Sequence, residues 1–131
     1  MNPSYLLDTC ALLAIQDGGT AFSKKVRSLL EAPDSRVMVS AISAFEIGQK
    51  IASGKLALPC TLGHWFQSML RQHALTEIQI TSSICIAAAA LPVRHKDPFD
   101  RMIIATAMEH RLPIITSDKI IPTYSKIKTL W

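Results

Sequence analysis

The chain has 131 residues, a length that fits one domain covering residues 1–131. Its hydrophobic fraction of 49% and charged fraction of 18% exclude a disordered chain, which has too little apolar surface to offset its conformational entropy. The formal net charge of +4 suits a protein that binds a polyanion, although many basic soluble proteins share such a charge.

The first half of the chain alternates between strand and helix patterns. A short apolar run stops at Asp8, and the helix-compatible stretch after it ends at Asp17-Gly18-Gly19. A second stretch carries apolar residues at helical spacing, and a β-branched run that is too short for a helix follows it. In chain order the expected elements are a strand at residues 4–7, helices at 10–15 and 20–31, a strand at 37–39 and a helix at 40–53.

The second half repeats this alternation. Thr81, Ser82 and Ser83 can cap an alanine-rich helix, which Pro92 ends. Pro98 is expected at the first position of the next helix, where its missing N–H group costs nothing. In chain order the expected elements are a helix at residues 62–74, a strand at 78–80, helices at 84–91 and 98–110, and strands at 113–116 and 127–130.

The alternation of short strands with helices predicts the fold class. Such an order needs crossover connections, and these build a parallel sheet whose two faces are both covered by helices. We therefore expect an α/β protein with a central, mostly parallel sheet of four to five short strands.

Two further features of the sequence indicate the cellular compartment. The longest nearly pure apolar run, residues 84–93, has about half of the roughly 20 residues that cross a bilayer, and no charged and then apolar leader opens the chain. Cys10, Cys60 and Cys85 are widely spaced and form no Cys-x-x-Cys pair. We expect a cytoplasmic protein without a membrane segment, and cysteines that are reduced and packed in the core.

Two acidic residues, Asp8 and Asp118, each follow an apolar strand. Open α/β sheets bind ligands at the carboxyl ends of their strands, so the position of these residues favours a functional role. Each of them can instead cap the helix that follows, and for either residue alone the two interpretations are balanced.

Two other acidic residues have stronger structural explanations. Glu46 lies three residues after Ser43, as in a capping box, and four residues before Lys50, where a helical ion pair forms. Asp97 is placed to cap a helix, and Asp100 then lies in the first turn, where an acid suits the helix dipole. Spacing alone favours the structural interpretation for Glu46 and leaves Asp100 undecided.

Four segments that carry these acids stand in a characteristic order. They are Leu6-Leu7-Asp8-Thr9, a Ser/Ala-rich helix start with Glu46, residues 95–107 (HKDPFDRMIIATA), and Ile114-Ile115-Thr116-Ser117-Asp118. Together they resemble the motifs of PIN-domain proteins, and essentially the whole chain resembles a VapC-type toxin of a bacterial or archaeal toxin–antitoxin pair. The stretch from Asp97 to Ala107 is the most specific part of the resemblance.

The resemblance implies a three-layer α/β/α PIN-like fold and a metal-dependent endoribonuclease. It implies that Asp8, Glu46, Asp100 and Asp118 form an acidic quartet that holds one or two Mg²⁺ or Mn²⁺ ions. Such ions prefer oxygen ligands and activate water for attack on a phosphodiester. In the proteins that the chain resembles, a VapB-like antitoxin wraps the toxin and blocks its acidic pocket, and the toxin subunits usually pair as homodimers. The expected substrate is RNA.

Hydroxyl and acidic neighbours of the quartet are candidates for supporting roles. Thr9 and Ser117 lie beside acids and are expected to hydrogen-bond to metal ligands or waters, although hydroxyl residues at strand ends also cap helices. Asp97 is interpreted as a helix cap next to the quartet.

Basic neighbours of the quartet are candidates for binding the substrate. Arg101 can orient a carboxylate or contact a phosphate, and a surface ion pair is an equal alternative. Arg94 and Lys96 precede the helix that carries Asp100 and can line the path of the RNA strand, or form a solvated basic loop. His95 belongs to the same basic run, and no histidine has the paired spacing of a zinc ligand.

Two alternative functions remain open. A haloacid-dehalogenase-like phosphatase also begins with a strand that ends in Asp, but it needs a second Asp two residues later, where this chain has Cys10. A non-catalytic PIN-fold protein that binds only RNA or a partner needs no acidic quartet, so the presence of all four acids argues against it.

Overall fold

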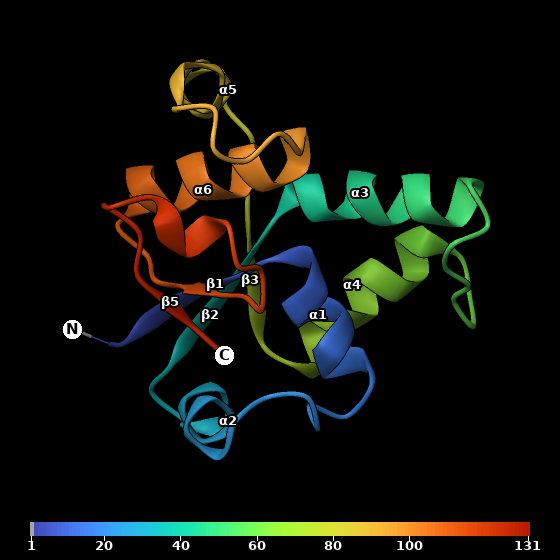
Figure 1. The fold of residues 1–131 in the computed structure, drawn as a ribbon. Helices are drawn as coiled ribbons and strands as arrows, with labels where there is room; N and C mark the ends of the chain where they lie inside the picture. The colour runs from blue at the N-terminus through green and yellow to red at the C-terminus, as the bar shows by residue number, and fades with distance from the viewer. Residues whose placement is uncertain (1) are drawn as a thin grey trace.

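The computed structural model describes residues 2–131 and shows an α/β architecture (Figure 1). This part of the chain forms five strands, six α-helices and one turn of 3₁₀ helix. The strands are β1 (Ser4–Leu7), β2 (Arg36–Ser40), β3 (Leu75–Ile78), β4 (Ile114–Ile115) and β5 (Thr129–Leu130). The helices are α1 (Thr9–Gln16), α2 (Lys24–Glu31), α3 (Ala41–Ala52), α4 (Leu62–Gln72), α5 (Ser82–Ala90), α6 (Pro98–His110) and the 3₁₀ turn η1 (Ile121–Thr123).

The strands form a single sheet in the order β3-β2-β1-β4-β5, and each neighbouring pair is parallel. Leu7 at the end of β1 pairs with Val39 on one side and with Ile115 on the other. The central strands therefore end level with one another, and the segments that follow β1, β2 and β4 leave the sheet at the same edge. This register brings distant parts of the sequence together there.

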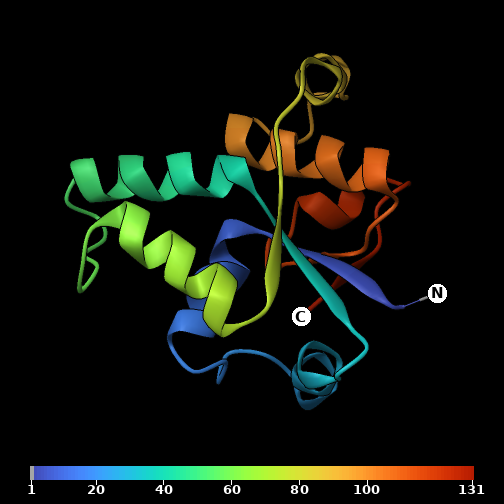
Figure 2. The ribbon, with the colours of Figure 1, turned by 180° about the vertical axis from the view of Figure 1, so that it is seen from behind.

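Helices cover both faces of the sheet. Successive residues of a strand point to opposite sides, so each strand contributes to both layers. Leu7 and Ile115 belong to a core cluster on one face, which includes buried residues of α1, α2, α3 and α4. Leu6 and Ile114 face the other side and pack against Ile103 and Ile104 of α6. The layered α/β fold expected from the sequence is confirmed, and the view from behind shows β3 at the edge of the sheet beside β2 (Figure 2).

Helix α5 forms an outer layer on α6, away from the sheet (Figures 1 and 2). Ile84 and Ala88 of α5 pack against Ala105 of α6. Within residues 2–131, none of the helices combines the length and apolar character that crossing a bilayer would require.

Several local expectations are wrong. The second helix begins at Lys24 rather than at residue 20, because the Ser23 hydroxyl caps it by accepting a hydrogen bond from the amide of Val26. The third strand ends at Ile78 instead of beginning there, since its register is set by pairing with β2.

The expected packing of the cysteines in the core is also wrong, although all three are free thiols as expected. The side chains of Cys10, Cys60 and Cys85 are all exposed. In α1 it is the neighbouring residues Ala11 and Leu12 that are buried, so Cys10 lies on the solvent side of that helix.

Candidate metal centre

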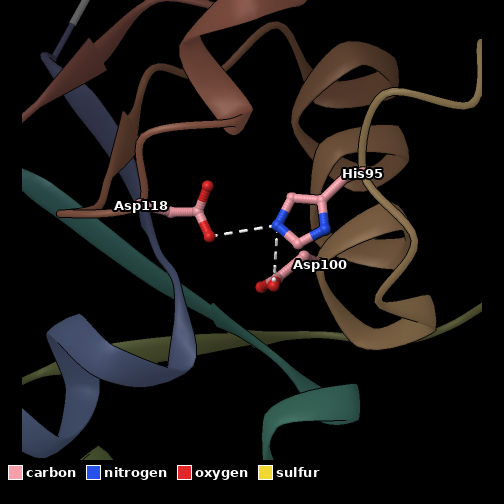
Figure 3. A group of neighbouring side chains, drawn as sticks. All are labelled: His95, Asp100 and Asp118. Carbon is pink, nitrogen blue, oxygen red and sulfur yellow. Dashed lines mark hydrogen bonds and ion pairs between the residues drawn. The ribbon is translucent and has the colours of Figure 1, made fainter.

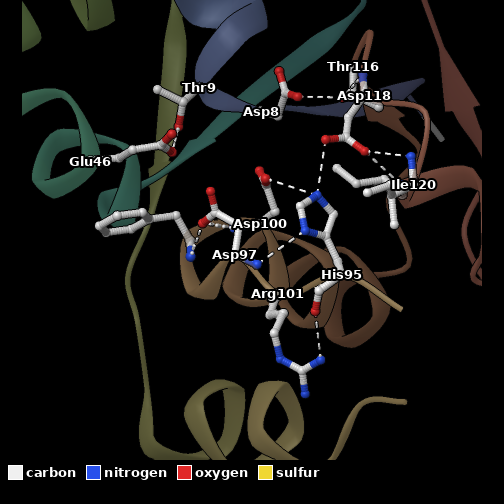
Figure 4. Close-up of polar contacts among 12 residues, drawn as sticks. Asp8, Thr9, Glu46, His95, Asp97, Asp100, Arg101, Thr116, Asp118 and Ile120 are labelled. Atoms are coloured by element: carbon white, nitrogen blue, oxygen red, sulfur yellow. Dashed lines mark hydrogen bonds and ion pairs between the residues drawn. The ribbon is translucent and has the colours of Figure 1, made fainter. Parts of the chain in front are cut away.

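The four predicted acids come from four separate elements at the carboxyl edge of the sheet (Figure 4). Asp8 follows β1, Glu46 lies on α3 after β2, Asp100 lies in the first turn of α6, and Asp118 follows β4. Figure 4 shows their carboxylates around a common space. The structure therefore brings together the side chains that the sequence scatters over 110 positions between Asp8 and Asp118.

Asp8 is both a helix cap and a member of this group. Its Oδ1 accepts a hydrogen bond from the amide of Ala11 at 2.8 Å, and its Oδ2 accepts one from the hydroxyl of Thr116. The side chain is 3% exposed. Burial raises the pKa of Asp8 and the charges of Glu46 and Asp118 add to this, although the two hydrogen bonds oppose the shift.

Asp118 is held by donors on both carboxylate oxygens. Its Oδ1 accepts hydrogen bonds from the amides of Ile120 at 2.7 Å and Ile121 at 3.0 Å, and its Oδ2 lies 3.0 Å from Nε2 of His95. Burial acts to raise the pKa of Asp118, but the hydrogen bonds from His95, Ile121 and Ile120 outweigh it and the pKa lies below its ordinary value. This carboxylate is fixed in its ionised form.

His95 lies inside the acidic group, which the sequence did not predict (Figure 3). The ring is buried, and its Nε2 lies 3.0 Å from Oδ2 of Asp118 and 3.1 Å from Oδ2 of Asp100. Its Nδ1 accepts a hydrogen bond from the amide of Asp97 at 3.3 Å. Because Nδ1 is an acceptor, the neutral ring carries its proton on Nε2 and donates it towards the two carboxylates. His95 therefore donates a hydrogen bond to Asp118 and also contacts Asp100.

Among the four acids, Asp100 has the most strongly shifted pKa. Burial first, and then the neighbouring charge of Asp97, raise its pKa to about 7, with smaller contributions of the same sign from Glu46 and Asp118. His95 opposes this shift. A carboxyl group with such a pKa loses its proton readily when a cation arrives, because the cation offsets the repulsion between the acids.

Glu46 is oriented by hydroxyl groups. The Thr9 hydroxyl donates to Oε1 of Glu46 at 2.6 Å and lies 2.9 Å from the hydroxyl of Ser43. Because Thr9 has one hydroxyl proton, Ser43 is the donor in its contact with Thr9. The expected ion pair with Lys50 is present at 3.6 Å. The expected capping box is wrong, since α3 begins at Ala41 and is capped by Ser40.

The hydroxyl that joins Asp8 and Asp118 belongs to Thr116. Thr116 Oγ1 donates to Asp8 and accepts a hydrogen bond from the amide of Asp118 at 3.0 Å. We had expected the neighbouring Ser117 to support the acids. Ser117 is exposed, and its role stays a prediction. Thr9 does contact an acid of the group, and Asp97 caps α6 by accepting hydrogen bonds from the amides of Phe99 and Asp100.

The guanidinium of Arg101 forms its hydrogen bonds with the main chain, and its expected role towards a carboxylate or a phosphate stays a prediction. Its guanidinium donates to main-chain carbonyl oxygens at the end of α5 and in the loop after it. Its donors reach carbonyl oxygens of α5 and of the loop between the two helices, so the side chain joins α5 to α6. The acceptors are Ala88, Ala89, Leu91, Pro92 and His95.

Arg94 and Lys96 are exposed in the loop before α6. The guanidinium of Arg94 donates to the carbonyl oxygen of Thr123 and lies 5.9 Å from the centre of the Tyr124 ring. Their expected contact with RNA stays a prediction.

The donor set fits a hard divalent cation. Ligand atoms of His95, Asp100 and Asp118 lie within 4.8 Å of one another, and Asp8 and Glu46 face the same space. Because the free lone pair of His95 is used by the amide of Asp97, carboxylate oxygens are the donors that remain. Oxygen ligands of this kind suit Mg²⁺ and Mn²⁺.

The sequence of the chain matches those of known proteins. The sequence model of the PIN domain matches residues 5–127. Over 82 residues the chain is 38% identical to ribonuclease VapC22 of Mycobacterium tuberculosis, and the match spans 62% of this chain and 62% of that relative.

Solved structures share the fold. A toxin–antitoxin complex from Klebsiella pneumoniae matches with a TM-score of 0.65 and 24% identity, over 97% of this chain and 98% of that chain. The structure of VapBC2 from Rickettsia felis, bound to a DNA fragment from its promoter, matches with a TM-score of 0.65 and 14% identity, over 96% of each chain.

Proposed function

The chain belongs to the PIN domain family, and on that premise we propose that it is a metal-dependent endoribonuclease that hydrolyses RNA phosphodiester bonds. The observation that carries the proposal is the gathering of Asp8, Glu46, Asp100 and Asp118 around one space at the carboxyl edge of the sheet. Acids placed in this way repel one another unless a cation lies between them.

The four carboxylates would hold Mg²⁺, or Mn²⁺ in its place. The bound ion would supply an activated water and offset negative charge on the phosphate and on the leaving oxygen. The protein's own part is to arrange the acids before the substrate arrives. Thr116 ties Asp8 to the main chain of Asp118, Thr9 orients Glu46, and His95 joins Asp118 to Asp100.

We further propose that the protein is the toxin of a type II toxin–antitoxin pair and acts on RNA in the cytoplasm. The relative from Mycobacterium tuberculosis is named a VapC ribonuclease, and the structure from Klebsiella pneumoniae is a toxin–antitoxin complex. A VapB-like antitoxin would cover the acidic site with a basic side chain, and the toxin subunits would pair as a homodimer.

Cleavage of RNA by the purified protein tests the proposed activity. We expect cleavage with Mg²⁺, none with EDTA, and a loss of at least about a hundredfold in Asp8→Asn and Asp100→Asn, because each removes a metal ligand. Asp34→Asn is the matched control, since Asp34 is an exposed acid in the turn before β2. If Asp8→Asn and Asp100→Asn cut RNA as well as Asp34→Asn does, the assignment of the site is wrong.

A non-catalytic PIN-fold protein makes a different prediction. It would bind RNA without binding Mg²⁺ or Mn²⁺ measurably in a calorimeter. Metal binding that is lost in Asp100→Asn but kept in Asp34→Asn would exclude this alternative.

A further inference from the structure

A second charged surface lies beside the C-terminal half of α6, and none of the four acids lines it. It consists of two neighbouring hollows, of ≈ 540 Å³ and ≈ 240 Å³, which share Met108 and Lys126 in their walls. The larger hollow is also lined by Arg111 and Lys128, and the smaller one by Arg94. We call the two hollows together the basic groove.

The charged residues that line the basic groove are all positive. Arg94, Arg111, Lys126 and Lys128 are all exposed, and no Asp or Glu lines either hollow. Within residues 2–131, none of these four cations forms an ion pair with a carboxylate. Cations that share one depression repel one another, so the groove attracts an anion of extended shape.

The floor of the groove is apolar. Met108 and Leu112 line the larger hollow, and Leu91 and Tyr124 line the smaller one. Leu91, Leu112 and Tyr124 are largely buried, so the exposed cations are the main groups that the groove offers to a ligand. Single-stranded nucleic acid suits these cations, because a positively charged groove contacts the phosphates along its backbone.

One end of the groove lies close to His95, which contacts two of the acids. Arg94 directly precedes His95, and the hydroxyl of Tyr124 accepts a hydrogen bond from the amide of His95 at 2.9 Å. At its far end the groove reaches Arg111, which follows the last residue of α6, whereas Asp100 lies in the first turn of that helix. Eleven helical residues span roughly 16 Å, about five nucleotides at the stacked spacing of roughly 3.4 Å per residue of a strand.

We propose that the basic groove binds the backbone of the RNA substrate on one side of the cleaved bond, at phosphates up to about five nucleotides from it. The proposal rests on the proposed function, because it takes the strand that enters the acidic group to continue into the groove. An acidic protein segment is favoured less, since one end of the groove lies beside His95, at the site that takes RNA under the proposed function.

The test compares two variants that carry the same net charge. The groove variant is Arg111→Gln, Lys126→Gln and Lys128→Gln, and it leaves Arg94 in place because that residue adjoins His95. The control variant is Lys24→Gln, Lys55→Gln and Arg71→Gln, three exposed cations that lie outside both hollows. All six positions are exposed, so both variants should fold, and circular dichroism checks this.

Binding is measured by fluorescence anisotropy with a labelled 16-nucleotide RNA and a labelled trinucleotide, in EDTA and over a range of KCl concentrations. Anisotropy reports binding rather than cleavage, so this result can be separated from the outcome of the cleavage test. We expect the groove variant to bind the 16-mer about tenfold more weakly than the control variant does. Its slope of log affinity against log salt should fall by about 2, since each phosphate contact on a single strand contributes about 0.7. The two variants should bind the trinucleotide equally.

Equal affinities of the two variants for the 16-mer would overturn the proposal. So would equal losses on the trinucleotide and the 16-mer, because the groove would then not act at a distance. A labelled poly-glutamate peptide forms a further arm. If the groove variant loses binding to this peptide but not to RNA, the groove is a site for an acidic protein and the proposal is wrong.

Discussion

His95 contacts Asp118 across 23 positions of the sequence, with 3.0 Å between the imidazole Nε2 and the carboxylate Oδ2. The same nitrogen lies 3.1 Å from Oδ2 of Asp100. One ring therefore sets the separation of two acids that belong to different elements. Since the other ring nitrogen accepts from the amide of Asp97, the ring should orient metal ligands without binding the metal itself.

The first prediction concerns this role. His95→Gln should lower Mn²⁺ affinity and the cleavage rate by about 10–100-fold, because removing a partner that orients metal ligands has effects of this size. In the parent protein, electron spin echo spectra of bound Mn²⁺ should show no directly coordinated nitrogen. His110→Gln is the matched control, since His110 lies at the end of α6, where its Nε2 is 3.7 Å from Glu109. A coordinated nitrogen signal that disappears in His95→Gln would show that His95 is a ligand.

The second prediction concerns Thr116. Thr116→Val keeps the shape of the side chain but removes the hydroxyl that joins Asp8 to the amide of Asp118. We expect a loss of about 1–3 kcal/mol in the free energy of unfolding, because a buried acceptor loses its donor. Metal affinity measured by calorimetry should fall about tenfold or more.

Thr106→Val provides the control for Thr116→Val. Thr106 is also fully buried, but its hydroxyl donates to the carbonyl oxygen of Met102 within α6. It should affect stability and leave metal affinity unchanged. Equal metal affinities in the two variants would contradict the role assigned to Thr116.

The third prediction concerns pH. The pKa of Asp100 is raised from 3.8 to about 7, so folding disfavours its ionised form. The metal-free protein should therefore lose stability as pH rises from about 4 to about 7, and the raised pKa of Asp8 acts in the same direction. The lowered pKa of Asp118 has the opposite sign, but its contribution is lost only as pH falls below about 3.8.

Urea unfolding in EDTA at pH 4.5, 6 and 8 checks this expectation. Asp100→Asn should flatten the dependence on pH and should be more stable than the parent at pH 8, because the variant has no charge to bury. Mg²⁺ should stabilise the parent more at pH 8 than at pH 6. A parent protein that becomes steadily more stable from pH 4.5 to pH 8 without metal would show that the acids do not repel one another.

The fourth prediction concerns Arg101. Arg101→Met keeps most of the apolar stem but removes the charged donor from carbonyl oxygens of α5 and the following loop. We expect a loss of about 2–3 kcal/mol in the free energy of unfolding, since hydrogen bonds to a charged group contribute about 1.5–3 kcal/mol. Thermal unfolding measures the loss.

Arg71→Met is the control for Arg101→Met, because Arg71 forms an exposed hydrogen bond to Ser68, and it should change stability by less than about 0.5 kcal/mol. At a temperature where both variants are folded, Arg101→Met should cut RNA at a rate close to that of the parent. A large loss of activity in a fully folded Arg101→Met variant would restore Arg101 as a residue that acts on the substrate.

Local patterns in the sequence determined much of this protein. The alternation of apolar runs predicted the layered α/β fold, and Asp97 caps α6 as its spacing with Pro98 indicated. Asp8 and Asp118 were expected at strand ends, and they lie there. These features depend on hydrogen bonds and periodicities that extend over only a few residues, so they can be read from one segment at a time.

Only the tertiary structure decided how those segments meet. In the folded chain His95 lies between Asp100 and Asp118, and Thr116 rather than Ser117 joins two acids. Arg101 points towards the end of α5. Each of these contacts depends on the direction of a side chain after the chain has crossed the sheet. A change of one position along a strand or helix reverses or rotates that direction. The physical reason is that sequence spacing sets which residues share a face, whereas packing between distant elements sets what that face contacts.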